Sequence, residues 1–73
     1  MMNEVRQIIS DSLSVPIPDI HPSSSLINDL GADSLDLANT VMAIEDRFDI
    51  NITEAQAAQM TTVADVVAHL EGL

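Results

Sequence analysis

Apolar residues recur with helical spacing at the start of this 73-residue chain. Four of them share the i, i+3, i+4, i+8 spacing of one helix face: Val5, Ile8, Ile9 and Leu13. Asn3 is a possible N-cap for this helix. Pro16 and Pro18 end it, because proline lacks the backbone N–H and disfavours helix in the residue before it. We therefore expect a first helix that ends before residue 15.

A proline- and serine-rich segment follows, up to residue 33. A structureless loop of this length is unusual inside a compact domain. Five apolar residues give it anchors against the helices: Val15, Ile17, Ile20, Leu26 and Leu30. We expect the segment to be packed, with a short turn of helix near residues 26–30.

Helical spacing resumes over residues 34–48. Its apolar positions are Leu37 or Ala38, Val41, Ile44 or Glu45, and Phe48. Asp33 fits the N-cap, because a side-chain oxygen there satisfies a backbone N–H that has no partner in the helix. Phe48 is the only aromatic residue of the chain, and we expect it to anchor the core.

Two further helices are marked by their first residues. Thr53 and Gln56 match a capping box that opens a short helix, to about Gln59. Thr62 precedes a stripe that predicts the last helix, with Gly72 near its end. The stripe consists of Val63, Val66, Val67 and Leu70. Residues 50–52 alternate in polarity, but with no strand to pair with they are expected to form a connector.

These elements predict an all-α fold. It is a small antiparallel four-helix bundle with three main helices and one short helix. The length allows one domain, over residues 1–73, and no internal repeat is present.

Charge limits the classes of partner. Twelve acids against two arginines give a formal net charge of −10. This charge argues against nucleic acid or an anionic membrane as partner and favours basic protein surfaces. The 47% hydrophobic content is too high for a disordered acidic tail, so the chain should fold.

The chain has no cysteine, so any thiol that it uses must be attached to it. Neither a secretory signal nor a membrane-spanning apolar run is present, and we expect a cytoplasmic monomer.

Catalysis by the chain itself is not expected. A serine nucleophile needs a base, and the two histidines, His21 and His69, are expected to be solvent-exposed polar residues. Acids after residue 45 superficially resemble a calcium loop. However, Glu54 stands where that loop needs glycine and Met60 where it needs a bidentate glutamate. We expect neither an enzyme nor a specific metal site.

The run from Asp29 to Asp36 places one serine, Ser34, between two acids and just after Gly31. On spacing alone, the simplest role of Ser34 is to help begin a helix. Residues 30–36, continued by residues 41–49, resemble the prosthetic-group site and second helix of the acyl carrier proteins of bacterial fatty acid synthesis. The resemblance covers nearly the whole chain.

In that family the serine of the D-S-L motif carries 4′-phosphopantetheine as a phosphodiester. The resemblance therefore implies attachment of this cofactor to Ser34 by a phosphopantetheinyl transferase that uses coenzyme A. Acyl intermediates would be carried as thioesters on its thiol, in fatty acid or related lipid or polyketide biosynthesis. Ser34 at the start of a helix suits this attachment, because the nearby N–H groups and the helix dipole favour a phosphate anion.

The resemblance also implies a docking surface for basic patches on acyl-transfer, chain-elongation or acyl-ligase enzymes. It assigns apolar contacts to Leu35 and Met42. It assigns acidic contacts to four residues: Asp33, Asp36, Glu45 and Asp46. Without the resemblance, these acids would be interpreted as a solvated helix face, and the two apolar residues as core.

Three positions depart from the family pattern. Asn39 replaces a recognition glutamate and Arg47 stands where an acid is common, which should weaken and redirect docking. Thr40 replaces a usual leucine and could alter the cavity that shelters an acyl chain, although its hydroxyl can bond back to the helix. We expect a specialised carrier.

Two alternatives from other classes remain. An unmodified acidic helical adaptor would bind a basic partner without any cofactor, and its binding would survive Ser34→Ala. A weak esterase would hydrolyse an activated ester through Ser34 of the unmodified chain.

Overall fold

The structure is a computed structural model that describes residues 1–72. Along these residues it contains one turn of 3₁₀ helix and four α-helices: α1 (Met2–Leu13), η1 (Ile17–Asp19), α2 (Ser34–Phe48), α3 (Glu54–Ala58) and α4 (Val63–Glu71). The described residues form no strand, and their single β-bridge pairs Ser25 with Thr62. The all-α expectation is confirmed, and residues 50–52 are a connector.

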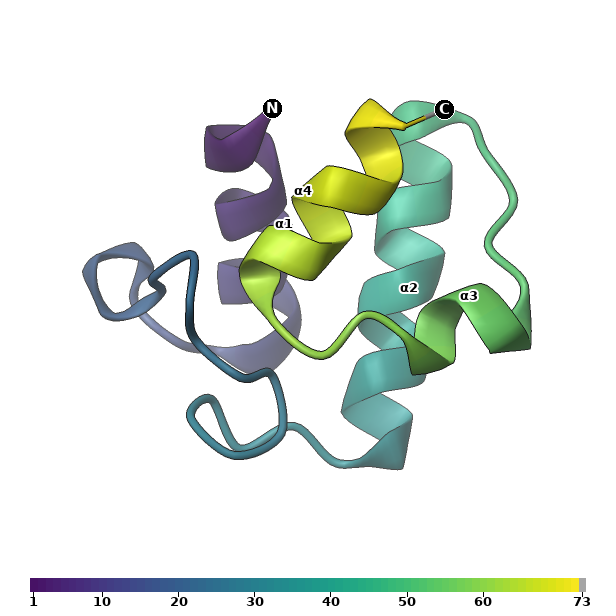
Figure 1. The fold of residues 1–73 in the computed structure, drawn as a ribbon. Helices are drawn as coiled ribbons and strands as arrows, with labels where there is room; N and C mark the ends of the chain where they lie inside the picture. The colour runs from purple at the N-terminus through teal and green to yellow at the C-terminus, as the bar shows by residue number, and fades with distance from the viewer. Residues whose placement is uncertain (73) are drawn as a thin grey trace.

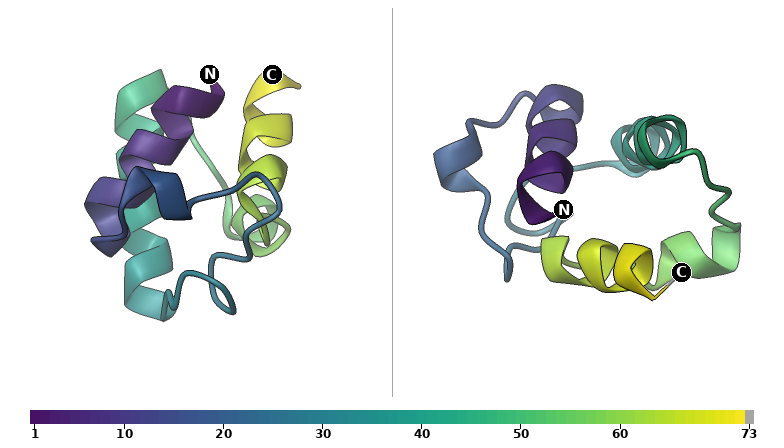
Figure 2. Two further views of the ribbon diagram at one scale, coloured as in Figure 1. Left: turned by 90° about the vertical axis from the view of Figure 1, so that its left-hand side faces the viewer. Right: turned by 90° about the horizontal axis from the view of Figure 1, so that it is seen from above.

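Three main helices surround the core (Figure 1). α2 and α4 run towards the end of the molecule where the described chain begins and ends, and α1 runs the opposite way. The short α3 lies across this direction (Figure 2). α1 packs against both α2 and α4. The core consists of Val5, Ile9, Ile20, Leu26, Ala32, Ile44, Met60, Val63, Val66, Val67 and Leu70. Phe48 is half-buried and packs against it.

The start of α2 is fixed by a reciprocal pair of hydrogen bonds. The Asp36 N–H donates to Asp33 Oδ1 at 2.8 Å, and the Asp33 N–H donates to Asp36 Oδ2 at 3.2 Å. This capping box satisfies two N–H groups that the helix leaves without partners. Gly31, with a φ of +75°, makes the turn that precedes the cap. The predicted cap at Asp33 is confirmed.

Capping boxes also begin α3 and α4; the first box and the cap at Thr62 were predicted, whereas the part of Asp65 in the second box was not. Thr53 pairs with Gln56, and Thr62 pairs with Asp65. The N–H of Thr62, and then that of Thr61, hold the pKa of the exposed Asp65 carboxyl below its ordinary value. α3 ends at Ala58, one residue before the predicted end.

The prediction of Asn3 as a cap is wrong. α1 begins at Met2, and the Val5 N–H bonds to the Met1 carbonyl at 3.0 Å. Among residues 1–72, no side chain caps this helix. The terminal ammonium lies 3.9 Å from the Glu4 carboxylate. Acids in a first turn are favourable to the helix dipole, so α1 can start before Asn3.

Residues 26–30, where a short turn of helix was expected, form a turn with a helical backbone bond from the Asp29 N–H to the Ser25 carbonyl at 3.0 Å, but they form no helix. The 3₁₀ turn η1 was not predicted. Proline is tolerated there because the first turn of a helix does not use its N–H groups. At residues 25–30 the chain forms a hydrogen-bonded turn instead. The Ser25 N–H donates to the Asp29 carboxylate at 2.6 Å, and the Asn28 N–H donates to the Ser25 hydroxyl at 3.1 Å. These side-chain bonds compete with helix formation.

One histidine is less exposed than predicted. His21 is exposed, but His69 is half-buried, and its Nε2 is buried without a hydrogen-bond partner among residues 1–72. His69 lies three residues after Val66 and directly before Leu70, so it stands at the edge of the inward face of α4. The expectation of exposure is wrong for His69, because the helix carries it partly inward with its apolar neighbours.

Candidate functional site

Ser34 is the first residue of α2, and it is exposed. Its hydroxyl makes no hydrogen bond to the residues that the structure describes. The Leu37 N–H bonds to the Asp33 carbonyl, and the Asp36 N–H bonds to the Asp33 carboxylate. The N–H groups of Ser34 and Leu35 therefore face solvent at the positive end of the helix dipole. This arrangement favours a phosphate group on the Ser34 oxygen.

The loop that precedes Ser34 is held from two sides. The Leu26 N–H donates to the Thr61 carbonyl at 3.0 Å, and the Ala32 N–H donates to the Leu26 carbonyl at 2.9 Å. Leu26 and Ala32 are both buried in the core. The position of Ser34 is thus fixed by the core and by the connection between α3 and α4.

Leu35 and Met42 are both exposed, by 68% and 54%. These two residues are therefore not core residues. They lie seven residues apart, so they share one face of α2 two turns apart. Ala38, Asn39 and Asp46 are also exposed, and they lie three or four residues from Leu35 or Met42, so they share the same helix face. We call these five residues the outer face of α2.

Three of the four acids predicted for docking accept hydrogen bonds from backbone N–H groups, and Asp46 is the exception. Asp33 and Asp36 form the capping box. Glu45 is half-buried, and its Oε2 accepts a hydrogen bond from the Ile52 N–H at 2.8 Å. Asp46 is exposed, and no hydrogen bond within the described chain involves its carboxylate. The sequence gives no sign of the Glu45 bond, since Ile52 lies beyond the end of the helix.

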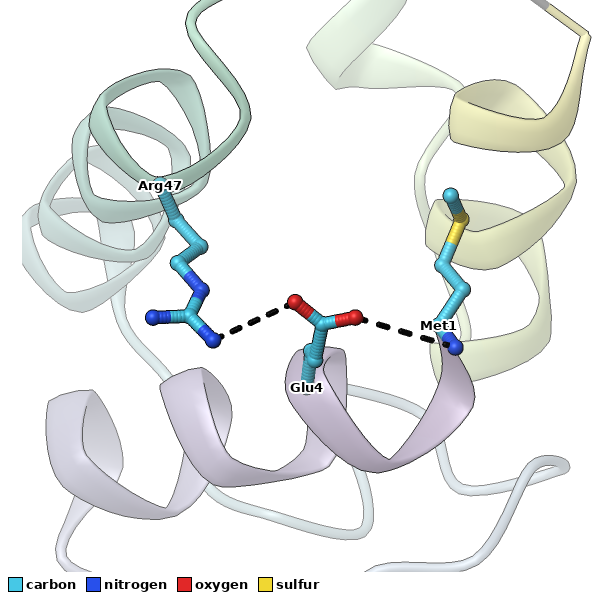
Figure 3. A network of polar contacts seen from close by, with 3 residues as sticks. All are labelled: Met1, Glu4 and Arg47. Carbon is cyan, nitrogen blue, oxygen red and sulfur yellow. Dashed lines mark hydrogen bonds and ion pairs between the residues drawn. The ribbon is translucent and has the colours of Figure 1, made fainter.

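Arg47, one of the departures from the family pattern, is paired within the molecule. Its Nη2 lies 3.2 Å from Glu4 Oε2, and the other oxygen of Glu4 faces the terminal ammonium of Met1 (Figure 3). The pair joins the end of α2 to the first turn of α1. Both partners are largely exposed, so the pair contributes at most about 1 kcal/mol.

A cavity of about 400 Å³ lies between α2, α3 and the connector that joins them. Most of its lining is apolar: Leu26, Leu37, Ala38, Thr40, Val41, Met42, Ile44, Ile52, Thr53, Glu54, Ala57, Ala58, Met60 and Val66. Thr40 is buried, and its hydroxyl donates to the Asp36 carbonyl at 2.8 Å. Its polar atom is thus satisfied by its own helix, which is the back-bonding considered from the sequence.

The described residues show neither a metal centre nor a membrane span. Residues 1–72 gather no group of three or more histidines, aspartates and glutamates that could hold a metal ion. Within the same range, every helix is too short or too polar to cross a bilayer.

Comparison with known proteins decides the family. The sequence pattern described as the phosphopantetheine attachment site matches residues 3–70. The chain belongs to this family. A solved structure described as a candidate acyl carrier protein from Mycobacterium tuberculosis superposes with a TM-score of 0.90. The two sequences are 31% identical, and the match covers 97% of this chain and 95% of that chain.

The chain is therefore a phosphopantetheine carrier with the fold of an acyl carrier protein. Carriers of this family are not catalysts, and phosphopantetheinyl transferases modify them. The exposed serine at the start of α2 fits the group, since its hydroxyl is unbonded within residues 1–72 and two N–H groups beside it are open.

Proposed function

We propose that this carrier holds acyl intermediates as thioesters on 4′-phosphopantetheine attached to Ser34. It would act in fatty acid or related lipid or polyketide biosynthesis, with residues 1–73 as a single acyl carrier domain. The observation that carries the proposal is the position of Ser34, an exposed hydroxyl at the first residue of α2. The cofactor supplies a thiol, which the chain lacks because it has no cysteine.

The residues beside Ser34 would bind and orient the phosphodiester. The open N–H groups of Ser34 and Leu35 and the helix dipole stabilise a negative charge there. Asp33 and Asp36 use their carboxylates to hold the helix start. Their role at the site is therefore to position the serine.

The cavity supports an aliphatic acyl chain as cargo. Its lining is mainly apolar, and the hydroxyl of Thr40 is already bonded. A polar group on the buried part of the cargo would lose its bonds to water without replacement. A saturated hydrocarbon chain would gain about 0.8 kcal/mol per buried methylene.

The proposed docking surface includes the six residues named from the resemblance: Asp33, Leu35, Asp36, Met42, Glu45 and Asp46. Leu35 and Met42 provide exposed apolar area on one face of α2. Acids surround this area, and the whole chain carries a net charge of −10. Such a surface suits an acyl-transfer, chain-elongation or acyl-ligase enzyme whose basic patch surrounds an apolar pocket.

The test loads the unmodified protein with a broad-specificity phosphopantetheinyl transferase, magnesium and a saturated acyl-coenzyme A. We expect the intact mass to rise by one acyl-phosphopantetheine. Hydroxylamine should then remove the acyl group and leave the phosphopantetheine, as it does for a thioester. The Ser34→Ala protein should gain nothing, whereas Ser23→Ala, which changes an exposed serine of the preceding loop, should load normally.

Absence of loading on a folded chain that is not already modified would contradict the proposal. Binding of a basic partner that survives Ser34→Ala, together with absence of loading, would favour an unmodified adaptor.

A further inference from the structure

We propose that a second cavity, between α3 and α4, binds an arginine side chain of a partner protein. We call it the α3–α4 cavity. The inference goes beyond the proposed function, because it involves neither Ser34 nor the cargo. None of the six residues of the proposed docking surface lines this cavity, so it is a separate contact made by other elements of the fold.

The α3–α4 cavity has a volume of about 310 Å³. α3 and α4 follow one another along one side of the molecule (Figure 2). The residues that line the cavity come from both helices and from the turn between them: Gln56, Gln59, Met60, Asp65, Ala68 and His69. Within the described chain this lining contains one carboxylate and two amides, but no lysine or arginine. It is therefore polar and negatively charged, unlike the apolar cavity beside α2.

The Asp65 carboxylate has one oxygen without a partner. Its Oδ2 accepts the N–H of Thr61 at 3.1 Å and the N–H of Thr62 at 3.0 Å. No hydrogen bond within residues 1–72 involves its Oδ1. The N–H of Thr62, and then that of Thr61, also lower the pKa of Asp65, so the carboxylate stays charged at neutral pH. The backbone thus fixes a negative charge beside the cavity and leaves one oxygen free to accept a donor.

The other polar groups of the lining are also incompletely bonded. Gln56 Oε1 accepts the Thr53 N–H at 2.9 Å, which holds this side chain in place and leaves one lone pair. The exposed Gln59 side chain makes no hydrogen bond within residues 1–72. In the same range, Nε2 of His69 is buried without a partner. The lining therefore offers more hydrogen-bonding groups than the chain itself uses.

A guanidinium group matches this lining better than other cations do. Its planar set of N–H donors can reach Asp65 Oδ1 and a glutamine amide oxygen at the same time. A lysine ammonium is instead a compact and strongly hydrated charge. Magnesium or calcium favours several oxygen ligands with more than one carboxylate, whereas the described lining has a single carboxylate. Met60 and Ala68 add apolar surface for the aliphatic part of an arginine side chain.

The net charge of the protein makes a cationic partner favourable in any case, since it is −10. This charge attracts every cation, so it does not by itself select arginine. The arrangement of acceptors in the α3–α4 cavity makes the selection, and the experiment must therefore compare cations of equal charge.

The experiment titrates the unmodified protein with N-acetylarginine methylamide and follows the side-chain amides by nitrogen-15 NMR. It does not depend on loading, so its result is separate from that of the proposed function. The chain has three glutamines, of which Gln56 and Gln59 line the cavity and Gln7 lies in α1. We expect saturable shifts at Gln56 and Gln59, with a dissociation constant on the order of 1 mM for one solvent-exposed ion pair. The Gln7 amide should show no saturable shift.

Variants separate this cavity from general attraction of cations. Asp65→Asn should weaken binding several-fold, because it removes the charge that faces the guanidinium. Asp46→Asn removes the same charge from α2 and should leave the dissociation constant within about twofold. Gln59→Ala should also weaken binding, and it should leave Tm within about 2 °C because this side chain is exposed and unbonded. It keeps the test valid if Asp65→Asn loosens the start of α4.

N-acetyllysine methylamide at the same ionic strength should bind several-fold more weakly than the arginine compound. Equal shifts with the two compounds would overturn the selection of guanidinium. Absence of saturable shifts at Gln56 and Gln59 would overturn the site itself. Displacement of the arginine compound by magnesium chloride, but not by sodium chloride of equal ionic strength, would also overturn the proposal and would identify a site for a divalent cation.

Discussion

Individual acids of α2 have different roles that their charge alone does not reveal. Asp33, Asp36 and Glu45 each accept a backbone N–H, whereas Asp46 is exposed. The first two could be predicted, because a capping box has a fixed three-residue spacing. The bond of Glu45 could not, since no local pattern relates a helix residue to a connector residue seven positions later.

Leu35 is the residue at which docking can be tested without a change in stability. Since its side chain is 68% exposed, Leu35→Ala should leave Tm within about 2 °C of the wild type. We expect kcat/KM for phosphopantetheine transfer to fall about tenfold, because an apolar anchor is lost. Leu35→Met keeps the apolar contact and should retain most of the rate. Transfer to Leu35→Ala at the wild-type rate would show that the transferase does not use this side chain.

Whole elements differ in how well the sequence marks them. α2 has the predicted bounds because a capping box fixes its start and apolar spacing continues to Phe48. η1 could not be predicted, since Pro16 and Pro18 indicate only that the first helix ends. A cavity was expected only from the family resemblance, with Thr40 in its lining, and its remaining boundaries could not be predicted from the sequence. The backbone of α1 packs closely on α2 and on α4. Within residues 1–72, α2 does not pack as closely on α3 or on α4, and this wider spacing leaves room for the cavity.

The end of α1 offers a test of local backbone strain. Ser14 has a φ of 57° and a ψ of 40°, in the left-handed region that favours glycine. Ser14→Gly should relieve about 1 kcal/mol of strain and raise Tm by about 4 °C. The same substitution inside the helix, Ser12→Gly, should lower Tm, because glycine disfavours helix there. A lower Tm for Ser14→Gly in thermal unfolding would contradict the claim that the backbone at Ser14 is strained.

The whole molecule carries negative charge with little internal compensation. Twelve acids face two arginines, and both arginines bond within the molecule. Arg6 donates to the Ile17 carbonyl and Arg47 donates to Glu4. The remaining acids repel one another and favour a cationic partner.

Salt should therefore stabilise the fold. Exposed charges are screened beyond about 8 Å at physiological ionic strength. We expect Tm to rise with potassium chloride, and to rise at lower concentration with magnesium chloride. The double variant Asp46→Asn, Asp49→Asn should show a smaller rise, because it has two fewer exposed acids. Differential scanning calorimetry across a salt series provides the measurement. A constant Tm would show that repulsion between the acids contributes little to the free energy of unfolding.

The position of the prosthetic group is the central claim. The most direct measurement is fragment-ion mass spectrometry of the protein after incubation with coenzyme A, magnesium and a phosphopantetheinyl transferase. The chain contains seven serines, three of them in the loop before α2 at positions 23–25. We predict that all the added mass lies on Ser34. Phosphopantetheine on another serine, or on none in a folded and initially unmodified chain, would contradict the account.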